Sequence, residues 1–135
     1  MTTKVIQIEL PEGSRIRVGV PADRPDDAIS ALCAHLGNRP TVEAAYLGLM
    51  EVLPPSGNSY FTYTIGMRCH DEHRVEEEAS ALAVLTQVPA GRWPISILPM
   101  TDRYFTHEAI RFYERKSSEK KRGILSRLFG GQDVL

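Results

Sequence analysis

The chain has 135 residues, of which 42% are hydrophobic and 24% charged, and its formal net charge is −1. This length fits one domain, and the composition is that of an ordinary globular protein, which excludes disordered and collagen-like chains. A nearly neutral chain has no long-range field to attract nucleic acid or membranes, so any such attraction has to come from a local cluster of charge.

The cysteine content and the hydropathy of the chain indicate its cellular compartment. The two cysteines, Cys33 and Cys69, are too few for a disulfide framework and do not have zinc-ligand spacing. The first residues lack the apolar core of a signal peptide, and every apolar run is broken well short of the roughly 20 residues that a membrane span needs. We therefore expect a cytoplasmic protein with reduced thiols.

The first third of the chain predicts two strands and a helix. Apolar and polar residues alternate over 5–10 and 15–20, which predicts half-buried strands, and the turn sequence Pro11-Glu12-Gly13 predicts a hairpin between them. A helix is expected after Pro25, because proline and the following acidic residues suit a first helical turn. Its apolar stripe comprises Ile29, Leu32, Cys33 and Leu36, and Gly37-Asn38 ends it.

The middle of the chain predicts a second pair of strands joined by a long loop. Val42–Leu53 is rich in apolar, β-branched and aromatic residues, and residues 54–59 form a loop rich in proline, glycine and serine. The strand predicted over Tyr60–Met67 alternates strictly, and its apolar phase comprises Phe61, Tyr63, Ile65 and Met67.

Three more elements are expected in the last half. Early acidic residues predict a helix over 71–88, and two helical rows predict that it buries a broad face: Val75, Ala79, Leu82 and Glu78, Ala81, Leu85. Trp93–Leu98 predicts a short strand, at a sheet edge or with Pro94 near its start. The helical spacing of four apolar residues predicts a last helix: Phe105, Ala109, Phe112 and Tyr113.

This order of elements predicts an α+β fold. Without its first strand, the order βαββαβ is that of a ferredoxin-like two-layer sandwich, here with an extra N-terminal strand and a C-terminal helix. We expect a single domain over residues 1–114 and a separate, flexible basic amphipathic tail over 115–135.

One cluster of metal-ligand side chains occurs, Cys69-His70-Asp71-Glu72-His73. A structural zinc site needs about four converging donors, and no second cluster completes this one, so we expect no bound metal and no cofactor. A metal- or thiol-dependent enzyme that uses Cys69, His70 and His73 is the least favoured alternative. No motif for a catalytic nucleophile or a phosphate-binding loop is present, so we expect no catalytic residues.

RNA-recognition modules share the βαββαβ order and stack bases on aromatic residues of their central strands. Here the strand 15–20 has no aromatic residue, and the phase of Phe61 and Tyr63 assigns both to the core. We therefore expect no binding of nucleic acid.

A short stretch is similar to amino-acid-binding regulatory (ACT-type) modules, which carry an Asp-Arg-Pro-Gly step between a strand and a helix. This chain has Asp23-Arg24-Pro25, followed by Asp26 in place of the glycine. Without that glycine the backbone cannot approach a ligand as closely. An amino-acid-sensing domain is therefore the alternative function.

A longer resemblance covers Val18 to Arg115. The chain resembles the C-terminal domain of SseB, the enhanced serine sensitivity protein, in its proline-rich approach to the first helix, in residues 42–47 (Val-Glu-Ala-Ala-Tyr-Leu) and in residues 95–99 (Ile-Ser-Ile-Leu-Pro). It also has Arg111-Phe112-Tyr113 where that family usually reads Pro-Phe-Tyr. The resemblance implies a small bacterial cytosolic interaction or regulatory module without catalytic residues.

The C-terminal segment is strongly basic. Residues 115–127 contain six basic residues and one acidic residue, a local net charge of +5, and a short apolar stripe overlaps their end. Such a segment can lie on an anionic membrane or dock into a groove of a partner. We expect a protein partner, with only weak membrane association, and also a homodimer formed through a sheet edge. The expected partner-binding residues are Lys120, Lys121, Arg122, Ile124, Leu125, Leu128 and Phe129.

Overall fold

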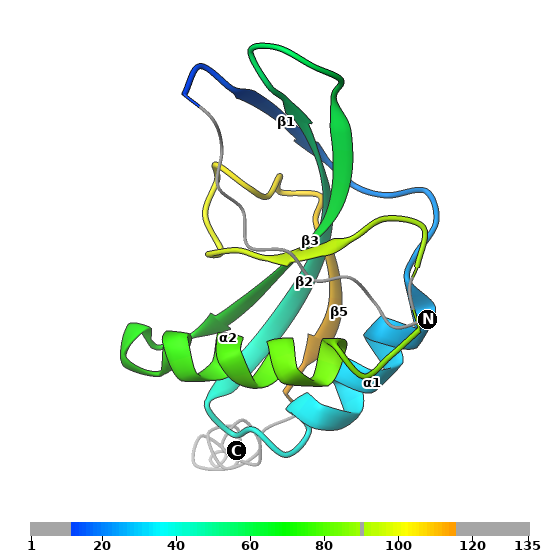
Figure 1. The fold of residues 1–135 in the computed structure, drawn as a ribbon. Helices are drawn as coiled ribbons and strands as arrows, with labels where there is room; N and C mark the ends of the chain where they lie inside the picture. The colour runs from blue at the N-terminus through cyan, green and yellow to red at the C-terminus, as the bar shows by residue number, and fades with distance from the viewer. Residues whose placement is uncertain (1–11, 90, 116–135) are drawn as a thin grey trace.

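The computed structural model describes residues 12–89 and 91–115 (Figure 1). Five strands and two helices follow one another in this part of the chain: β1 (Arg15–Gly19), α1 (Asp26–Leu36), β2 (Val42–Leu53), β3 (Tyr60–Cys69), α2 (Asp71–Leu85), β4 (Ile95–Ile97) and β5 (Ile110–Glu114). The two helices and the central strands lie where the sequence predicts them. The strand expected over 5–10 and the tail from 116 onward lie outside the described residues.

The sheet is mixed and centres on β2, which has 12 residues. One edge of β2 pairs along its length with β3, and the other edge is shared, because β1 pairs with Leu49–Leu53 and β5 pairs with Ala44–Leu47. All of these pairs are antiparallel, whereas β3 and β4 are parallel. An apolar strand of this length offers enough backbone for three partners.

The predicted ferredoxin-like strand order is not what the sheet shows. In a split βαβ unit the two strands that flank a helix are parallel and another strand lies between them. Here β1 and β2 flank α1 but are antiparallel neighbours, and β3 and β4 flank α2 as directly adjacent parallel strands. The α+β class is therefore confirmed, and the finer topology differs, because pairing partners are chosen by long-range packing that the order of elements does not encode.

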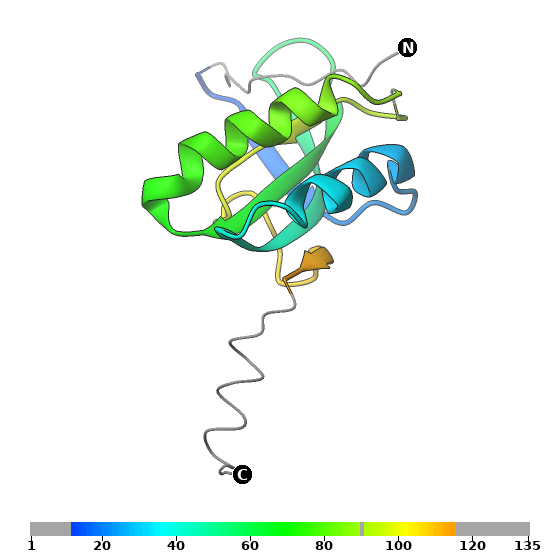
Figure 2. The same cartoon turned by 90° about the horizontal axis from the view of Figure 1, so that it is seen from below.

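Both helices pack on one face of the sheet and share one core with it (Figures 1 and 2). The predicted apolar phase of β3 faces this core: Tyr63, Ile65 and Met67 are buried, and the ring of Phe61 lies 5.0 Å from that of Trp93. The contributions of α1 are Ala28, Leu32 and Leu36, and those of α2 are Ala81 and Leu85.

The prediction that α2 buries a broad face is wrong for one of its two rows. Ala81 and Leu85 are buried, but Val75, Ala79 and Leu82 point away from the domain and are exposed. Only one side of a helix can face the sheet, and the side that does so here is marked by Glu77, a buried acid that hydrophobicity alone does not predict.

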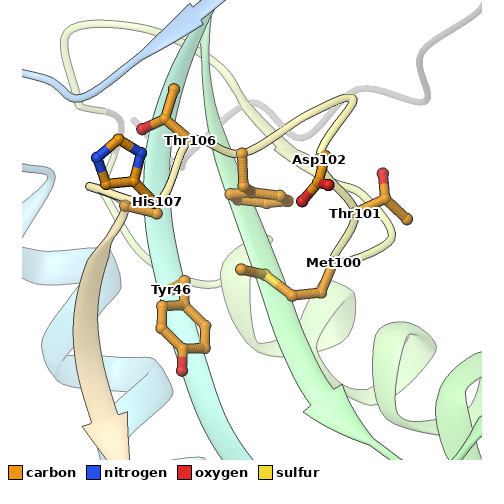
Figure 3. A pocket seen from close by; sticks show the side chains of 8 residues that line it. Tyr46, Met100, Thr101, Asp102, Thr106 and His107 are labelled. Atoms are coloured by element: carbon orange, nitrogen blue, oxygen red, sulfur yellow. The ribbon is translucent and has the colours of Figure 1, made fainter.

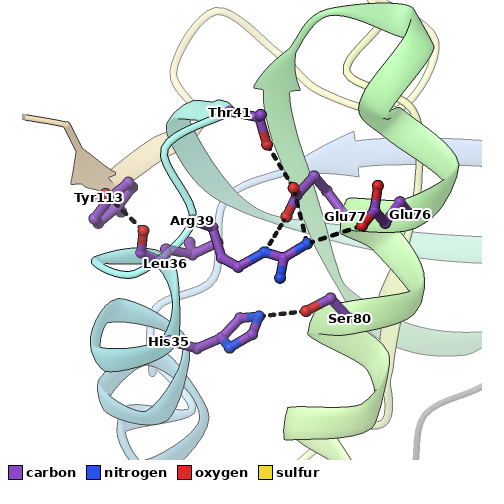
Figure 4. A network of polar contacts seen from close by, with 8 residues as sticks. All are labelled: His35, Leu36, Arg39, Thr41, Glu76, Glu77, Ser80 and Tyr113. Atoms are coloured by element: carbon purple, nitrogen blue, oxygen red, sulfur yellow. Dashed lines mark hydrogen bonds and ion pairs between the residues drawn. The ribbon is translucent and has the colours of Figure 1, made fainter.

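The buried carboxylate of Glu77 joins α2 to the segment between α1 and β2 (Figure 4). The Arg39 guanidinium donates two hydrogen bonds to its carboxylate, at 2.9 and 3.1 Å, and the Thr41 hydroxyl donates a third. Burial alone raises the pKa of Glu77, but the hydrogen bonds from Arg39 and Thr41 outweigh burial and hold this pKa below its ordinary value. Glu76 adds a longer ion pair to Arg39 at 3.6 Å.

The second face of the sheet is covered by the segment from Leu98 to Ala109, where a helix was expected. Residues 101–109 form turns, and the chain then enters strand β5 rather than a helix. The side chains of Phe105 and Leu98 are buried with Met50 and Val52 of β2 in a second, smaller core.

The structure of strand β5 explains why the spacing of apolar residues wrongly predicted a helix in this part of the chain. Phe112 and Tyr113 are adjacent and both half-buried, because an irregularity in the β2–β5 register between Ala45 and Tyr46 lets both contribute to the helix-side core. The Tyr113 hydroxyl donates a hydrogen bond to the carbonyl oxygen of Leu36, at 3.0 Å, which ties β5 to the end of α1 (Figure 4). Two adjacent inward residues at such a bulge imitate a helical pattern.

Candidate functional site

A hollow of about 260 Å³ lies between the 98–109 segment and the second face of the sheet (Figure 3). We call it the sheet-face hollow. Its lining comes from β2 and from the covering segment: Tyr46, Met100, Thr101, Asp102, Phe105, Thr106, His107 and Ala109. The aromatic and sulfur-containing side chains form its apolar part, and the remaining lining is largely polar.

Gly66 makes room for the apolar floor of this hollow, and Gly48 lies beside it. A Cβ atom on Gly66 would lie 2.7 Å from both the Phe105 ring and the sulfur of Met100, and one on Gly48 would lie 3.4 Å from the same ring. The approaches at Gly66 are closer than van der Waals contact permits, whereas 3.4 Å at Gly48 is an ordinary contact, and the close neighbour of Gly48 is the Thr64 hydroxyl oxygen at 2.7 Å. The alternation of β3 therefore matters on both faces of the sheet. Its apolar residues face the helices, and Gly66 on the other face lets Phe105 approach the sheet.

Tyr46 is held at the edge of the hollow by a polar chain. Arg68 donates a hydrogen bond to the Tyr46 hydroxyl at 3.0 Å, and the same guanidinium lies 3.5 Å from the carboxylate of Glu43. Asp102 and His107, which also line the hollow, are exposed. The hollow thus combines an aromatic floor with acidic, basic and hydroxyl groups around its opening.

A second hollow, of about 320 Å³, lies at the Asp23-Arg24-Pro25 step that resembles ACT-type modules. Its lining includes Arg24, Asp26 and Asp27 at the start of α1, together with Pro89 and Gly91 from the segment after α2. This lining places two carboxylates beside one guanidinium, an arrangement that disfavours the carboxylate of a free amino acid. The nearby Asp23 pairs with Arg92 at 3.6 Å.

The structure does not bring the Cys69–His73 cluster together as a metal site. Within residues 12–89 and 91–115, no group of three or more histidine, cysteine or acidic side chains is placed to hold a metal ion. Burial is the main reason that the pKa of the Cys69 thiol is raised, with Glu77 adding to it, and burial also raises the pKa of Cys33. Both thiols are therefore less ionised at neutral pH than an exposed cysteine.

One pair with the chemistry of a nucleophile and base occurs between the helices. The Oγ atom of Ser80 lies 2.6 Å from Nε2 of His35 (Figure 4). Neither residue lines either of the hollows described above, so a substrate bound in one of them would not touch this pair. The contact closes the α1–α2 interface beside the Arg39–Glu77 ion pair.

The sequence-predicted partner-binding residues, Lys120 to Phe129, lie outside the described residues. The sheet-face hollow was not predicted, because its lining comes from a segment that was expected to be helical. The available signal was the pair of glycines within strongly predicted strands, since glycine in a strand often marks a close approach of another part of the chain.

A family model for the SseB protein C-terminal domain matches residues 10–115. The chain belongs to this family. No curated protein and no solved structure matches the chain. The matched residues include all those that line the sheet-face hollow.

No helix in the described part of this SseB C-terminal domain is both long enough and apolar enough to cross a membrane.

Proposed function

We propose that this SseB C-terminal domain is a non-enzymatic protein-binding module that receives one side chain of a partner in the sheet-face hollow. The observation that carries the proposal is the form of that hollow. Its volume of about 260 Å³ is at the lower end of the roughly 300–1,000 Å³ of typical small-molecule pockets. This size suits a single inserted side chain, which is how many protein interfaces are anchored.

The lining supports the same conclusion. Tyrosine and methionine are enriched at protein interfaces, and both border the hollow, as Tyr46 and Met100. The hydroxyl, carboxylate and imidazole groups around the opening provide the polar rim that such interfaces have. The raised pKa of the Cys33 and Cys69 thiols is a second argument against a thiol-dependent reaction.

The test compares full-length protein with two variants that carry the same substitution. Thr101→Arg fills the hollow from an exposed rim position, and Thr86→Arg, at the exposed end of α2, is the matched control. Partners that are captured by the parent and by Thr86→Arg, but lost by Thr101→Arg at unchanged melting temperature, support the proposal. Equal capture by both variants would refute binding through this hollow.

Amino-acid sensing is the alternative, and the hollow beside Arg24 is the observation that favours it. A ligand present at 100 times its Kd adds about 2.7 kcal/mol of stability. We expect a thermal-shift screen of the common amino acids to show no such rise, because Asp26 and Asp27 repel the ligand carboxylate. A reproducible rise with one amino acid, lost in Arg24→Ala, would make sensing the better proposal.

A further inference from the structure

Helix α2 carries an apolar stripe that no described part of the chain covers. Val75, Ala79 and Leu82 follow one another at four- and three-residue spacing, so they lie along one side of the helix. Val75 is 72% exposed and Leu82 42% exposed, although both are large apolar residues. We call these three residues the α2 stripe.

Acidic residues border the α2 stripe on both sides. Helical spacing places Glu72 and Glu76 along one border and Asp71 and Glu78 along the other. The side chains of Glu72 and Glu76 are 78% and 73% exposed. This surface therefore suits a segment with apolar residues in its middle and basic residues around them.

The same chain contains a segment of that composition. Residues 120–129 combine four basic with four apolar side chains: Lys120, Lys121, Arg122, Arg127 and Ile124, Leu125, Leu128, Phe129. The charges of the two parts are also opposite, since residues 1–114 have ten basic and fifteen acidic residues, whereas residues 115–135 have six basic and two acidic residues. The tail is therefore attracted electrostatically both to the acidic borders of the α2 stripe and to the net negative charge of residues 1–114.

The chain leaves the described structure at the end of the sheet where α2 begins. The backbone N–H of Arg115 donates to the carbonyl oxygen of Glu43, at 2.8 Å, and the neighbouring Val42 pairs with Cys69, two residues before α2 begins. The end of β5 and the start of α2 are both at the lower end of the sheet in Figure 1. Eight residues, 116–123, separate Arg115 from Ile124, the first apolar residue of the segment, and span up to about 26–29 Å when extended, whereas α2 is about 22 Å long. The apolar residues of the segment can therefore reach the α2 stripe.

We propose that residues 120–129 dock on the α2 stripe of their own chain. The apolar residues of the segment cover Val75, Ala79 and Leu82, and its basic residues face Glu72, Glu76 and Asp71. Tethering gives the segment an effective concentration near the millimolar range, so even a contact that is weak between separate molecules forms within one chain. While docked, the tail is withheld from membranes and from other proteins, and its release exposes two complementary surfaces at once.

Backbone amide resonances of the full-length protein provide the test. Leu125→Asp combined with Leu128→Asp alters the tail, Val75→Asp alters the stripe, and Val20→Asp, at an exposed valine after β1, is the matched control. We expect the tail variant to shift the resonances of residues 72–83 and Val75→Asp to shift those of residues 120–129. Val20→Asp should shift neither set, and since Val75 and Val20 are exposed, all variants should keep the fold.

Charge and dilution complete the test. Salt at 1 M, where the Debye length is about 3 Å, should move the α2 resonances of the parent toward those of the tail variant. Dilution should leave them unchanged. Resonances of α2 that do not respond to the tail variant overturn the proposal, including the case in which the tail sediments with anionic vesicles instead. Shifts that disappear on dilution also overturn it, because they would place the tail on a second copy.

Discussion

At the scale of single residues, two buried threonines on β3 differ in their hydrogen bonding. Both are fully buried on the face of the sheet away from the helices. The Thr62 hydroxyl lies 2.8 Å from the Ser96 hydroxyl and 3.0 Å from the carbonyl oxygen of Pro94, whereas the Thr64 hydroxyl has no hydrogen-bond partner among the described residues. A buried polar group without a partner is destabilising.

We therefore expect Thr64→Val and Thr62→Val to have opposite effects. Valine keeps the shape of threonine, so Thr64→Val should be neutral or stabilise by up to about 1 kcal/mol. Thr62→Val should lower the free energy of unfolding by about 1–3 kcal/mol, because it also leaves Ser96 without its partner. Urea denaturation of both variants measures this difference, and a loss of stability in Thr64→Val would indicate that a water molecule or another group completes the site.

Glu77 makes stability depend on pH. Its lowered pKa means that the unfolded chain binds more protons than the folded one as pH falls below about 4.5, the ordinary value. The stabilisation is therefore present above that pH and is lost as pH falls through the folded-state pKa. Glu77→Gln keeps the shape, weakens the contact with Arg39 and should cost about 1–3 kcal/mol at neutral pH.

The difference between parent and Glu77→Gln should shrink on acidification, since the parent carboxylate then becomes neutral as well. Melting temperatures between pH 7 and pH 3 measure it, with Glu108→Gln, at an exposed acid outside α2, as the control. A difference that stays constant over this range would mean that Glu77 acts through packing and not through its charge.

At the scale of elements, two buried side chains hold the 98–109 segment on the sheet, and Phe105 is the larger of them. Phe105 is buried against Gly48 and Gly66, and the rest of the segment forms turns. Removing a buried phenylalanine side chain typically costs about 3–5 kcal/mol. Phe105→Ala should therefore lower the denaturation midpoint strongly, whereas Glu108→Ala, at an exposed position of the same segment, should change stability by less than about 0.5 kcal/mol. Similar midpoints for the two variants would contradict this role of Phe105.

At the scale of the whole molecule, β2 holds the fold together. It alone among the described strands pairs with three others, and its buried residues belong to both cores. Local opening is least probable where most contacts have to break together. Amide hydrogen exchange should therefore be slowest in β2 and the adjoining part of β3, and faster in the three-residue edge strand β4. Equal protection of β2 and β4 would show that the sheet opens as one unit.

Local sequence patterns predicted the structure correctly where it depends on residues that are adjacent in the chain. Helix α1 begins after Pro25 with Asp26 and ends at Leu36 before Gly37, as predicted, because helix ends depend on residues adjacent in the chain. The apolar phase of β3 was also predicted, since alternation records which side faces a core. Periodicity failed for 105–113, where a short strand with a bulge has the same spacing of apolar residues as a helix.

Local patterns in the amino-acid sequence were enough to predict the α+β class, the two helices, the central strands and the resemblance to the SseB C-terminal domain that the family match confirms. The neighbours of each strand, the buried side of α2 and the position of the hollow became known only from the three-dimensional fold. The physical reason is that strand pairing and helix orientation depend on contacts between residues far apart in the chain. Arg39 with Glu77 and Phe105 with Gly66 are such contacts, and neither residue of either pair reveals its partner by its own local pattern.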